Sequence, residues 1–205
     1  TESGRAQILY HQAAPILLDH IPQAWRSTSI IHLAPIAREL DVTLALSGKL
    51  SASLLGVTPQ GWMRKWDENG RVTACDWDVY ASEQILSQAG GVVISVEDIN
   101  YDLELVELMA HQTQVFCLTE GESGAVLHWN GDRRRFRPPV VEEVDATGAG
   151  DIFAAAFFVR LFEARDPWEA ARFATNLAAY SVTRFGLDGI PTQQEIESCL
   201  MEVLS

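Results

Sequence analysis

Residues 144–153 read Val-Asp-Ala-Thr-Gly-Ala-Gly-Asp-Ile-Phe, and this stretch governs how the rest of the chain is interpreted. Glycine tolerates positive φ, so Gly148 and Gly150 allow a tight turn that exposes several backbone N–H groups at one point. The apolar residues that follow predict a helix, whose N-terminal dipole end adds positive potential there. Backbone donors and a helix dipole together favour an anion, and a phosphate above most others. The stretch therefore predicts an anion-binding turn.

Asp151 lies in the first turn of that predicted helix, where its negative charge would repel a bound phosphate. Two interpretations of this carboxylate are open from the residues alone. In one, Asp151 accepts the proton of a hydroxyl group that attacks a bound phosphoryl group. In the other, it is an ordinary first-turn acid that stabilises the helix, and the glycines form a structural turn. Spacing alone favours the structural interpretation, because short glycine-rich turns are common.

The composition fits a globular α/β chain and argues against several classes of protein. The chain has 205 residues, of which 47% are hydrophobic, which is enough for one domain with a sizeable core. Its net charge of −13 argues against nucleic acid or an anionic membrane as the main partner. No apolar run approaches the roughly 20 residues that span a bilayer, and no charged-then-apolar signal segment opens the chain. We therefore expect a soluble protein.

The three cysteines, Cys75, Cys117 and Cys199, lie far apart and outside any metal-ligand spacing. An odd number of separated cysteines is typical of a reducing compartment. We expect core or surface thiols in a cytoplasmic protein.

Apolar runs and helical segments alternate along the chain, which predicts a parallel sheet with helices on its faces. The predicted strands are 29–34, 54–59, 91–95 and 114–119, and the predicted helices are 79–88, 101–110, 152–162, 167–183 and 192–204, with a helical crossover inside 35–53. Ligands of such sheets bind at the carboxyl ends of the strands. Residues 95–98 and 119–121, which follow two of these strands, should therefore share one edge with the glycine turn.

Two segments carry aromatic or basic residues whose use is open. Within residues 60–66, two tryptophans flank Arg64 and Lys65, and they line a ligand mouth or cover an edge of the core; packing is the more frequent use. Residues 124–137 predict a β-hairpin about the turn 130–132. The arginines 133–135 in this hairpin suit a phosphate clamp, but a solvated hairpin arm is the more common explanation.

Residues 145–151, Asp-Ala-Thr-Gly-Ala-Gly-Asp, resemble the C-terminal signature of the ribokinase-like (PfkB) carbohydrate kinases, Asp-Thr-x-Gly-Ala-Gly-Asp. The strand, glycine turn and hairpin of residues 119–137 precede it, as they do in that family. Ala146 replaces the usual Thr, a change that touches neither the anion hole nor the base. The order of elements agrees from residue 29 to the C-terminus, and this reverses the balance between the two interpretations of Asp151.

The resemblance implies a ribokinase-like fold, with three α/β/α layers and a mostly parallel central sheet in one domain over residues 1–205. Full-length relatives begin with a further portion that holds the first strands, a small β lid and most of the sugar-binding residues. That portion is absent from this chain, which begins with Thr1. We expect either a fragment or a short form that completes its sheet with another molecule. Because exposed β edges tend to be paired, a homodimer is one such form.

The resemblance also implies roles for single residues. The N–H groups of Gly148, Ala149 and Gly150 would face the charge that develops on the γ-phosphoryl of ATP during its transfer. Asp151 would then be the general base on the acceptor hydroxyl. The residues that match the family's nucleotide site are Thr119, Gly121, Thr147, Asn176 and Gly186.

Metal and acceptor sites follow from the same resemblance. The family's Asn-x-x-Glu motif corresponds to Ser-Val-Glu-Asp, in which Ser95 and Asp98 keep oxygen ligands on shorter side chains that suit water-mediated contact with Mg²⁺. The segment around Asp145 corresponds to a site for a monovalent cation, K⁺, in many relatives. Gln60 and Arg64 are the local candidates for binding the acceptor, and Gln60-Gly61-Trp62 looks similar to members with polyol or inositol substrates.

Two functions from different classes follow. We expect an ATP-dependent kinase that transfers a phosphoryl group to a hydroxyl of a sugar, polyol or nucleoside. The alternative is a nucleotide-binding or regulatory module, inactive without the half that holds the substrate.

Overall fold

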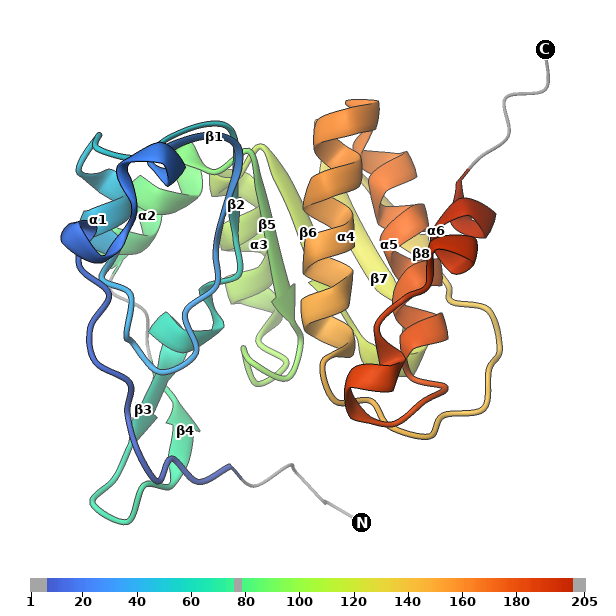
Figure 1. The fold of residues 1–205 in the computed structure, drawn as a ribbon, viewed down its shortest axis with the longest axis horizontal. Helices are drawn as coiled ribbons and strands as arrows, with labels where there is room; N and C mark the ends of the chain where they lie inside the picture. The colour runs from blue at the N-terminus through green and yellow to red at the C-terminus, as the bar shows by residue number, and fades with distance from the viewer. Residues whose placement is uncertain (1–6, 76–78, 201–205) are drawn as a thin grey trace.

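Six strands form one sheet in the order β1-β2-β5-β6-β7-β8 in the computed structural model of the chain (Figure 1). The structure describes residues 7–75 and 79–200, with the backbone alone for 79–82. The strands are β1 Ser27–Leu33, β2 Ser51–Val57, β5 Gly91–Ser95, β6 Val115–Thr119, β7 Ala125–Trp129 and β8 Asp132–Phe136. The first four run parallel, and β7 and β8 add the predicted antiparallel hairpin. The mostly parallel sheet is confirmed.

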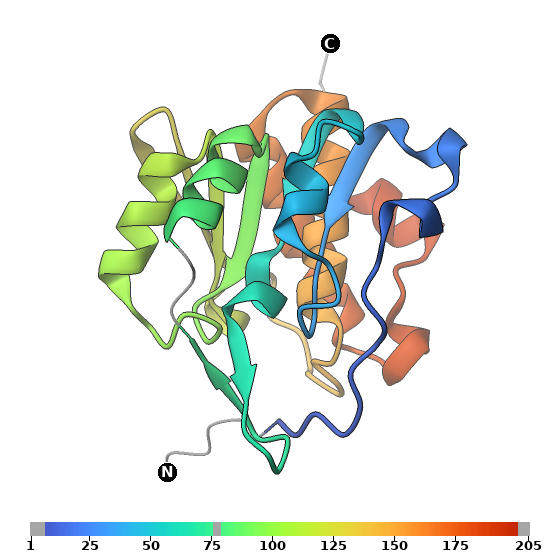
Figure 2. The same cartoon turned by 90° about the vertical axis from the view of Figure 1, so that its left-hand side faces the viewer.

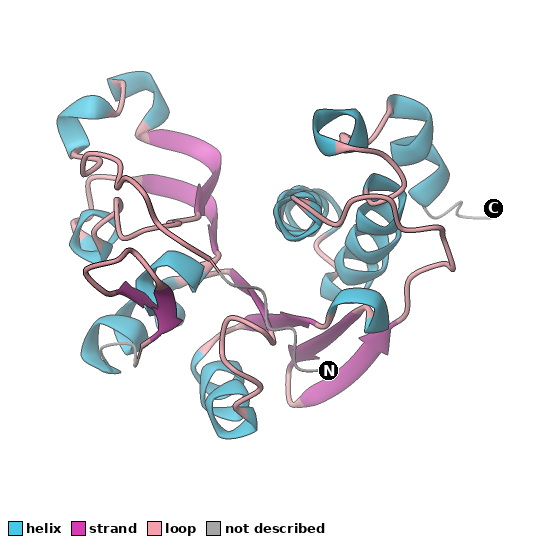
Figure 3. Cartoon of the chain, turned by 90° about the horizontal axis from the view of Figure 1, so that it is seen from below, coloured by secondary structure: helices cyan, strands magenta, loops and turns pink. Residues whose placement is uncertain are grey.

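Helices cover both faces of this sheet (Figures 1 and 3). The helices α1 Val42–Leu46, α2 Val79–Gln88 and α3 Leu103–Gln112 lie on one face, and α4 Ala149–Ala164, α5 Pro167–Ser181 and α6 Gln193–Cys199 lie on the other. Each face has its own core: Phe157 and Phe158 of α4 are fully buried on one, and Ile85 and Met109 on the other. The predicted three-layer ribokinase-like architecture is therefore confirmed.

Local capping signals explain where several helices begin. Asp166 accepts hydrogen bonds from the backbone at the start of α5, and Pro167 takes the first helical position, as predicted. The helix α3 begins two residues later than predicted, because Asn100 and Tyr101 adopt φ of 50° and 60° and Asp102 is the cap. The helix α4 begins earlier, at Ala149, so its first turn lies inside the glycine stretch.

The ends of the sheet are staggered. Val57, the last residue of β2, pairs with Val92 of β5, so β5 continues three residues further, to Ser95. The crossover between β1 and β2 is helical over only five residues, α1, and runs otherwise as loop. β1 and β2 thus end below the carboxyl ends of β5 and β6, which pair up to Ser95 and Thr119.

Residues 59–74 form an excursion beyond the end of β2, shown at the bottom of Figure 2. It consists of the 3₁₀ helix η3 Pro59–Met63 and the antiparallel strands β3 Arg64–Trp66 and β4 Val72–Ala74. Trp62 is buried, and its Nε1–H donates to the carbonyl oxygen of Leu40 at 2.6 Å. Trp62 therefore packs in the core, the more frequent of the two uses predicted for it.

β1 is an edge strand among the described residues. The side chain of Thr28 satisfies two backbone groups of this strand. Its hydroxyl accepts from the N–H of Ile30 and donates to the carbonyl of the same residue. Such local bonding reduces the capacity of an edge to pair with another chain. The homodimer stays a prediction.

All three cysteines are free thiols, as predicted. Cys117 and Cys199 are buried, and burial raises the pKa of both thiols. Among the described helices, none is long and apolar enough to cross a membrane.

Arg184 and Glu195 connect the loop after α5 to α6. An Arg184 Nη1 to Glu195 Oε1 distance of 2.7 Å defines their ion pair, and Glu195 also accepts from the N–H of Thr192 at 2.7 Å. The hydrogen bond from Arg184, followed by those from Thr192, lowers the pKa of Glu195 to about 2. The pair thus contributes stability that depends on an ionised carboxylate.

We predict that Glu195→Gln lowers the free energy of unfolding by about 0.5–1 kcal/mol at pH 7. Because the folded-state pKa lies below the ordinary value of 4.5, this contribution is complete above pH 4.5 and is lost as the pH falls toward 2. Urea unfolding of both proteins across this pH range measures it. A difference that stays constant with pH contradicts the prediction, and Glu142→Gln, in an exposed loop, is the control.

Candidate active site

The carboxyl ends of the parallel strands and the N-terminus of α4 lie at the same end of the molecule, the lower end in Figure 1. Ser95 and Thr119 are paired at the ends of β5 and β6, and the N–H of Val96 donates to the carbonyl of Thr119 at 2.9 Å. Residues 95–98 and 119–121 therefore share one edge with the glycine turn, as predicted from the alternation of strands and helices.

The glycine turn leaves backbone donors open at the start of α4. Gly148 is the N-cap residue, with φ of 84° and ψ of −4°. The N–H of Ala149 donates to the carbonyl of Ala146 at 3.2 Å, whereas those of Gly148, Gly150 and Asp151 have no hydrogen-bond partner among the described residues. A Cβ at Gly148 or Gly150 would meet nothing within 4 Å. An anion can therefore approach these donors directly, and Ala149 is the least available of the three residues predicted.

Asp145 fixes this turn to the loop that follows α5. Its Oδ1 accepts from the N–H of Thr147 at 2.9 Å, and its Oδ2 accepts from the N–H of Gly186 at 3.0 Å. Its own N–H donates to the carbonyl of Val182. The carboxylate thus joins two segments that the sequence assigned to one nucleotide site. A role of Asp145 at a monovalent cation stays a prediction.

The other predicted nucleotide residues lie around the same edge. Gly121 has φ of 57° and open space at its Cβ position, and Thr119 is half-buried at the end of β6. Asn176 is half-buried on α5, and its amide has no hydrogen bond with another described residue. Phe185, beside Gly186, is 71% exposed. This aromatic ring beside the predicted adenine site is a candidate contact with the base that the sequence indicated only through its loop.

The hairpin arginines are exposed and paired with acidic or aromatic side chains. Arg134 lies 3.0 Å from Asp132 and also stacks over the ring of Trp168, with its Cζ 4.2 Å from the ring centroid. Arg135 forms an ion pair with Glu120, between Thr119 and Gly121. The solvated hairpin arm is therefore confirmed.

The structure brings Gln60, Arg64 and Asp98 together. Gln60 Nε2 donates to Asp98 Oδ1 at 2.8 Å, and Arg64 Nη2 lies 3.1 Å from the same oxygen. The side chains of Arg64 and Asp98 are only 15% and 12% exposed. Two residues predicted to bind the acceptor thus bind a residue predicted to bind metal.

The contacts of Asp98 with Arg64 and Gln60 limit the ways in which Asp98 could bind a metal ion. The charge of Asp98 is balanced by Arg64, and the Ser95 hydroxyl accepts from the N–H of Glu97 at 3.2 Å. No group of three or more His, Cys, Asp or Glu side chains in the described part of the chain could hold a metal. The donor set fits Mg²⁺ held mainly by the phosphates of a donor, with water-mediated contact to Ser95 and Asp98. These metal roles stay predictions.

His32 and Thr58 form a pair that the sequence prediction missed. The distance from His32 Nε2 to Thr58 Oγ1 is 2.7 Å, and the imidazole packs edge-on against Phe158, with ring centroids 4.8 Å apart. Gly56 makes this packing possible, because a Cβ there would lie 2.7 Å from the Phe158 ring. The position of His32 two residues before the end of the predicted strand 29–34 was the signal that could have revealed it.

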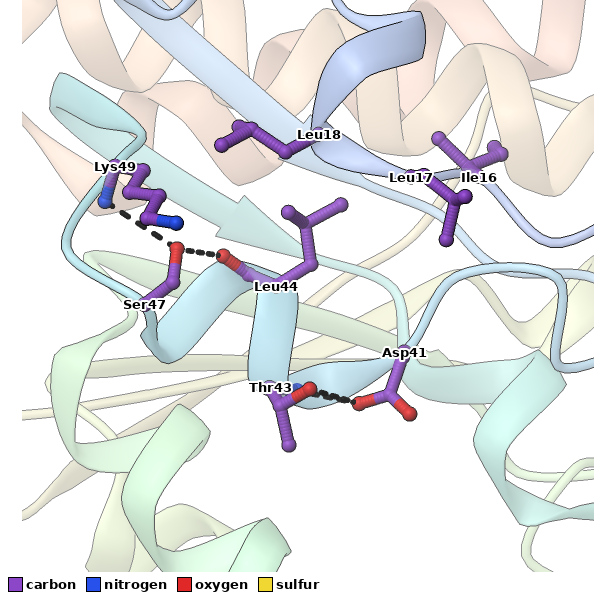
Figure 4. A pocket seen from close by; sticks show the side chains of 8 residues that line it. All are labelled: Ile16, Leu17, Leu18, Asp41, Thr43, Leu44, Ser47 and Lys49. Carbon is purple, nitrogen blue, oxygen red and sulfur yellow. Dashed lines mark hydrogen bonds between the residues drawn. The ribbon is translucent and has the colours of Figure 1, made fainter.

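Two surface hollows lie outside the glycine turn, and His32 lines the second of them. One, of about 340 Å³, is lined by Leu18, Leu44 and Lys49 among others, and Figure 4 shows its polar groups hydrogen-bonded to one another. The second, of about 490 Å³, runs along β1 and is lined mostly by apolar residues. Neither includes a residue of the glycine turn. The candidate site rests on the residues of the carboxyl edge and not on either hollow.

Comparison with known proteins agrees with this geometry. A family described as the pfkB family carbohydrate kinases matches residues 83–193, which is more than half of the chain. The chain belongs to this family.

Two curated relatives illustrate the range of pfkB-family proteins that the chain resembles. It is 42% identical over 101 residues to the ribokinase of Bacillus subtilis, covering 48% of this chain and 34% of that protein. It is 30% identical over 148 residues to the inositol 3-kinase of Zea mays, covering 72% of this chain and 38% of the maize protein. The chain thus spans about a third of the length of these relatives.

Solved structures of the family share the fold. A ribokinase from Thermotoga maritima superposes with a TM-score of 0.66 at 23% identity, over 88% of this chain and 60% of that chain. A pyrophosphate-dependent kinase of the ribokinase family, complexed with a pyrophosphate analogue and myo-inositol, superposes with a TM-score of 0.76 at 20% identity, over 95% of this chain and 70% of that chain. At these identities the likeness establishes the fold alone.

We predict that Gly150→Ala leaves the fold intact but weakens anion binding. The added Cβ has no neighbour within 4 Å, and alanine raises helix propensity by up to about 1 kcal/mol, so the melting temperature should not fall. The methyl group lies where an anion would approach the open N–H groups, and we expect ATP affinity to fall about tenfold or more. Calorimetry with ATP and a thermal melt measure both effects. Unchanged affinity would show that the anion binds elsewhere.

A double-mutant cycle tests the Arg64–Asp98 pair. We predict that Arg64→Met and Asp98→Asn each destabilise the chain by about 2–3 kcal/mol, because each leaves a mostly buried partner uncompensated. The double variant should lose less than the sum, which urea unfolding measures. Strictly additive losses contradict the coupling.

Proposed function

We propose that this chain carries the phosphoryl-transfer site of an ATP-dependent kinase whose acceptor is a hydroxyl group of a sugar, polyol or nucleoside. The observation that carries the proposal is the start of α4. There the N–H groups of Gly148 and Gly150, which have no hydrogen-bond partner in the part of the chain that the structure describes, lie within one turn of Asp151. The open donors suit a phosphoryl group, and the carboxylate beside them suits a proton acceptor.

The roles follow from charge. The open N–H groups stabilise the negative charge that builds on the transferring phosphoryl group. Asp151 is exposed, and its carboxylate has no hydrogen bond or ion pair with another described residue, so it can accept the proton of an incoming hydroxyl. The bond from the hydroxyl oxygen to phosphorus forms as the bond to the leaving ADP oxygen breaks. Mg²⁺, bound with the nucleotide, would neutralise charge on its phosphates, with Ser95 and Asp98 as water-mediated contacts.

A nucleotide donor is supported by the loop that Asp145 ties to the glycine turn. Gly186 lies in this loop, the exposed Phe185 ring is its neighbour, and Asn176 on α5 has a free amide among the described residues. Aromatic and amide groups of this kind suit a purine base. Some structural neighbours are pyrophosphate-dependent myo-inositol kinases, so the donor test includes pyrophosphate.

The family resemblance also suggests which molecules the chain binds. Small polyhydroxylated molecules are the proposed substrates, with no role for nucleic acid or membrane. The proposal further includes a K⁺ ion bound at the segment around Asp145, a homodimer and a cytoplasmic location.

We predict that Asp151→Asn lowers turnover by about two to four orders of magnitude and leaves ATP affinity largely unchanged, because only the proton acceptor is lost. The assay follows ADP release with ATP, and phosphate release with pyrophosphate, over a panel of sugars, polyols and nucleosides. Glu163→Gln, at the opposite end of α4 and 58% exposed, is the matched control.

The outcomes separate the candidate functions. Turnover at the parental rate in Asp151→Asn contradicts the assignment of the base. ATP binding by the parent protein without acceptor-stimulated ADP release favours a nucleotide-binding module instead. Turnover with pyrophosphate but not with ATP would support phosphoryl transfer to a hydroxyl group and would show that the donor is pyrophosphate and not ATP.

A further inference from the structure

The His32 imidazole leans toward the carboxyl edge of the sheet. His32 is in register with Gly56, and its hydrogen-bond partner Thr58 lies two residues further along the chain than Gly56. Two residues of extended chain correspond to about 6–7 Å toward that edge. The ring therefore extends from β1 toward the end of the sheet where α4 begins.

The helix α4 places Asp151 on the same side as this ring. Phe158, which contacts the imidazole, follows Asp151 by seven residues, or two helical turns of about 10 Å. Residues seven apart lie on the same side of a helix, and the two residues between them on this side, Ala154 and Ala155, have only methyl side chains. No large side chain of α4 on this side stands between Asp151 and the His32–Thr58 pair.

Electrostatics agrees with this arrangement. Burial lowers the pKa of His32, and the negative charge of Asp151 opposes that effect, so the carboxylate lies within electrostatic reach of the ring. A histidine with a lowered pKa is neutral at pH 7. The pair of His32 and Thr58 is therefore uncharged when Asp151 is ionised.

The neutral pair has unused hydrogen-bonding capacity. Only the bond between His32 Nε2 and Thr58 Oγ1 is found for these two side chains among the described residues. Thr58 is the N-cap of η3, but its hydroxyl makes no capping bond. Whichever partner donates, the pair keeps at least one donor and one acceptor. A hydroxyl group of a ligand, which is itself both donor and acceptor, matches that combination.

We propose that His32 and Thr58 are acceptor-binding residues, which hold a second hydroxyl group of the same molecule whose first hydroxyl group faces Asp151. This inference rests on the proposed kinase function and names its acceptor class: a neutral compound with at least two hydroxyl groups. A sugar phosphate is disfavoured, because the pair carries no positive charge and Asp151 would repel the anion. A simple monohydric alcohol could not occupy both positions.

The test uses three neutral probes, myo-inositol, D-ribose and D-fructose, with variants made in the intact protein. Thr58→Val keeps the shape of the side chain and removes its hydroxyl, and we expect it to weaken binding of the recognised probe about 10- to 100-fold. Thr58→Ser restores the hydroxyl and should bind within about threefold of the parent. Thr73→Val, at an exposed position of β4, is the matched control and should bind like the parent.

A second readout reports on His32 directly. In nuclear magnetic resonance spectra, the imidazole signals of His32 should shift when the recognised probe saturates the protein, and His32→Phe identifies those signals. Thermal melts of each variant separate lost binding from lost folding. Parental affinity in a folded Thr58→Val protein, unmoved His32 signals, or failure of all three probes to bind the parent would each overturn the inference.

The result also separates this inference from the kinase proposal. Probe binding that depends on Thr58 without any phosphoryl transfer leaves the hydroxyl-binding pair in place and removes the kinase function. Phosphoryl transfer at the parental rate in the Thr58→Val variant supports the kinase function and overturns the role of the hydroxyl-binding pair.

Discussion

The left-handed conformation of Gly148 is the constraint on which the site depends. A residue with a Cβ is strained at φ of 84°, so only glycine lets the chain turn there and enter α4 at once. The helix then begins without a side-chain cap, and the N–H groups of Gly150 and Asp151 have no hydrogen-bond partner among the described residues. An ordinary Ser or Asp cap would stabilise the helix better but would occupy those donors. The chain thus lacks a side-chain cap at the place of the proposed anion site.

Packing fixes where this helix end lies. Phe158 fits against the sheet only because Gly56 has no side chain, and the same ring supports His32. At the other end, the Asp145 carboxylate joins the turn to the loop at Gly186. The catalytic carboxylate proposed here is therefore held from two directions, by apolar contact along α4 and by charge-assisted hydrogen bonds before it. Neither support uses the donors or Asp151 itself.

The sequence predicted what local patterns encode. The strand ends that carry Ser95 and Thr119 and the helix start at Asp166 follow from periodicity and capping, which act over a few residues. The pairing of Arg64 with Asp98 was not predictable in this way, because it joins residues 34 apart through tertiary packing. The His32–Thr58 pair needed the register between two strands, and the start of α3 at Leu103 needed the positive φ of Asn100 and Tyr101.

Because β2 and β5 are staggered, the strands end at different levels along the edge of the sheet that carries the site. At the carboxyl edge, β5 extends three residues beyond β2, and η3 lies beside this extension. β1 ends level with β2 and pairs with no other strand among the described residues. β1 therefore forms the outer edge of the sheet on the side where the strands end earlier. On that side, the exposure of a ligand bound at the proposed site depends on what lies along β1. A strand that pairs there would change how quickly ligands exchange while leaving the reacting groups untouched.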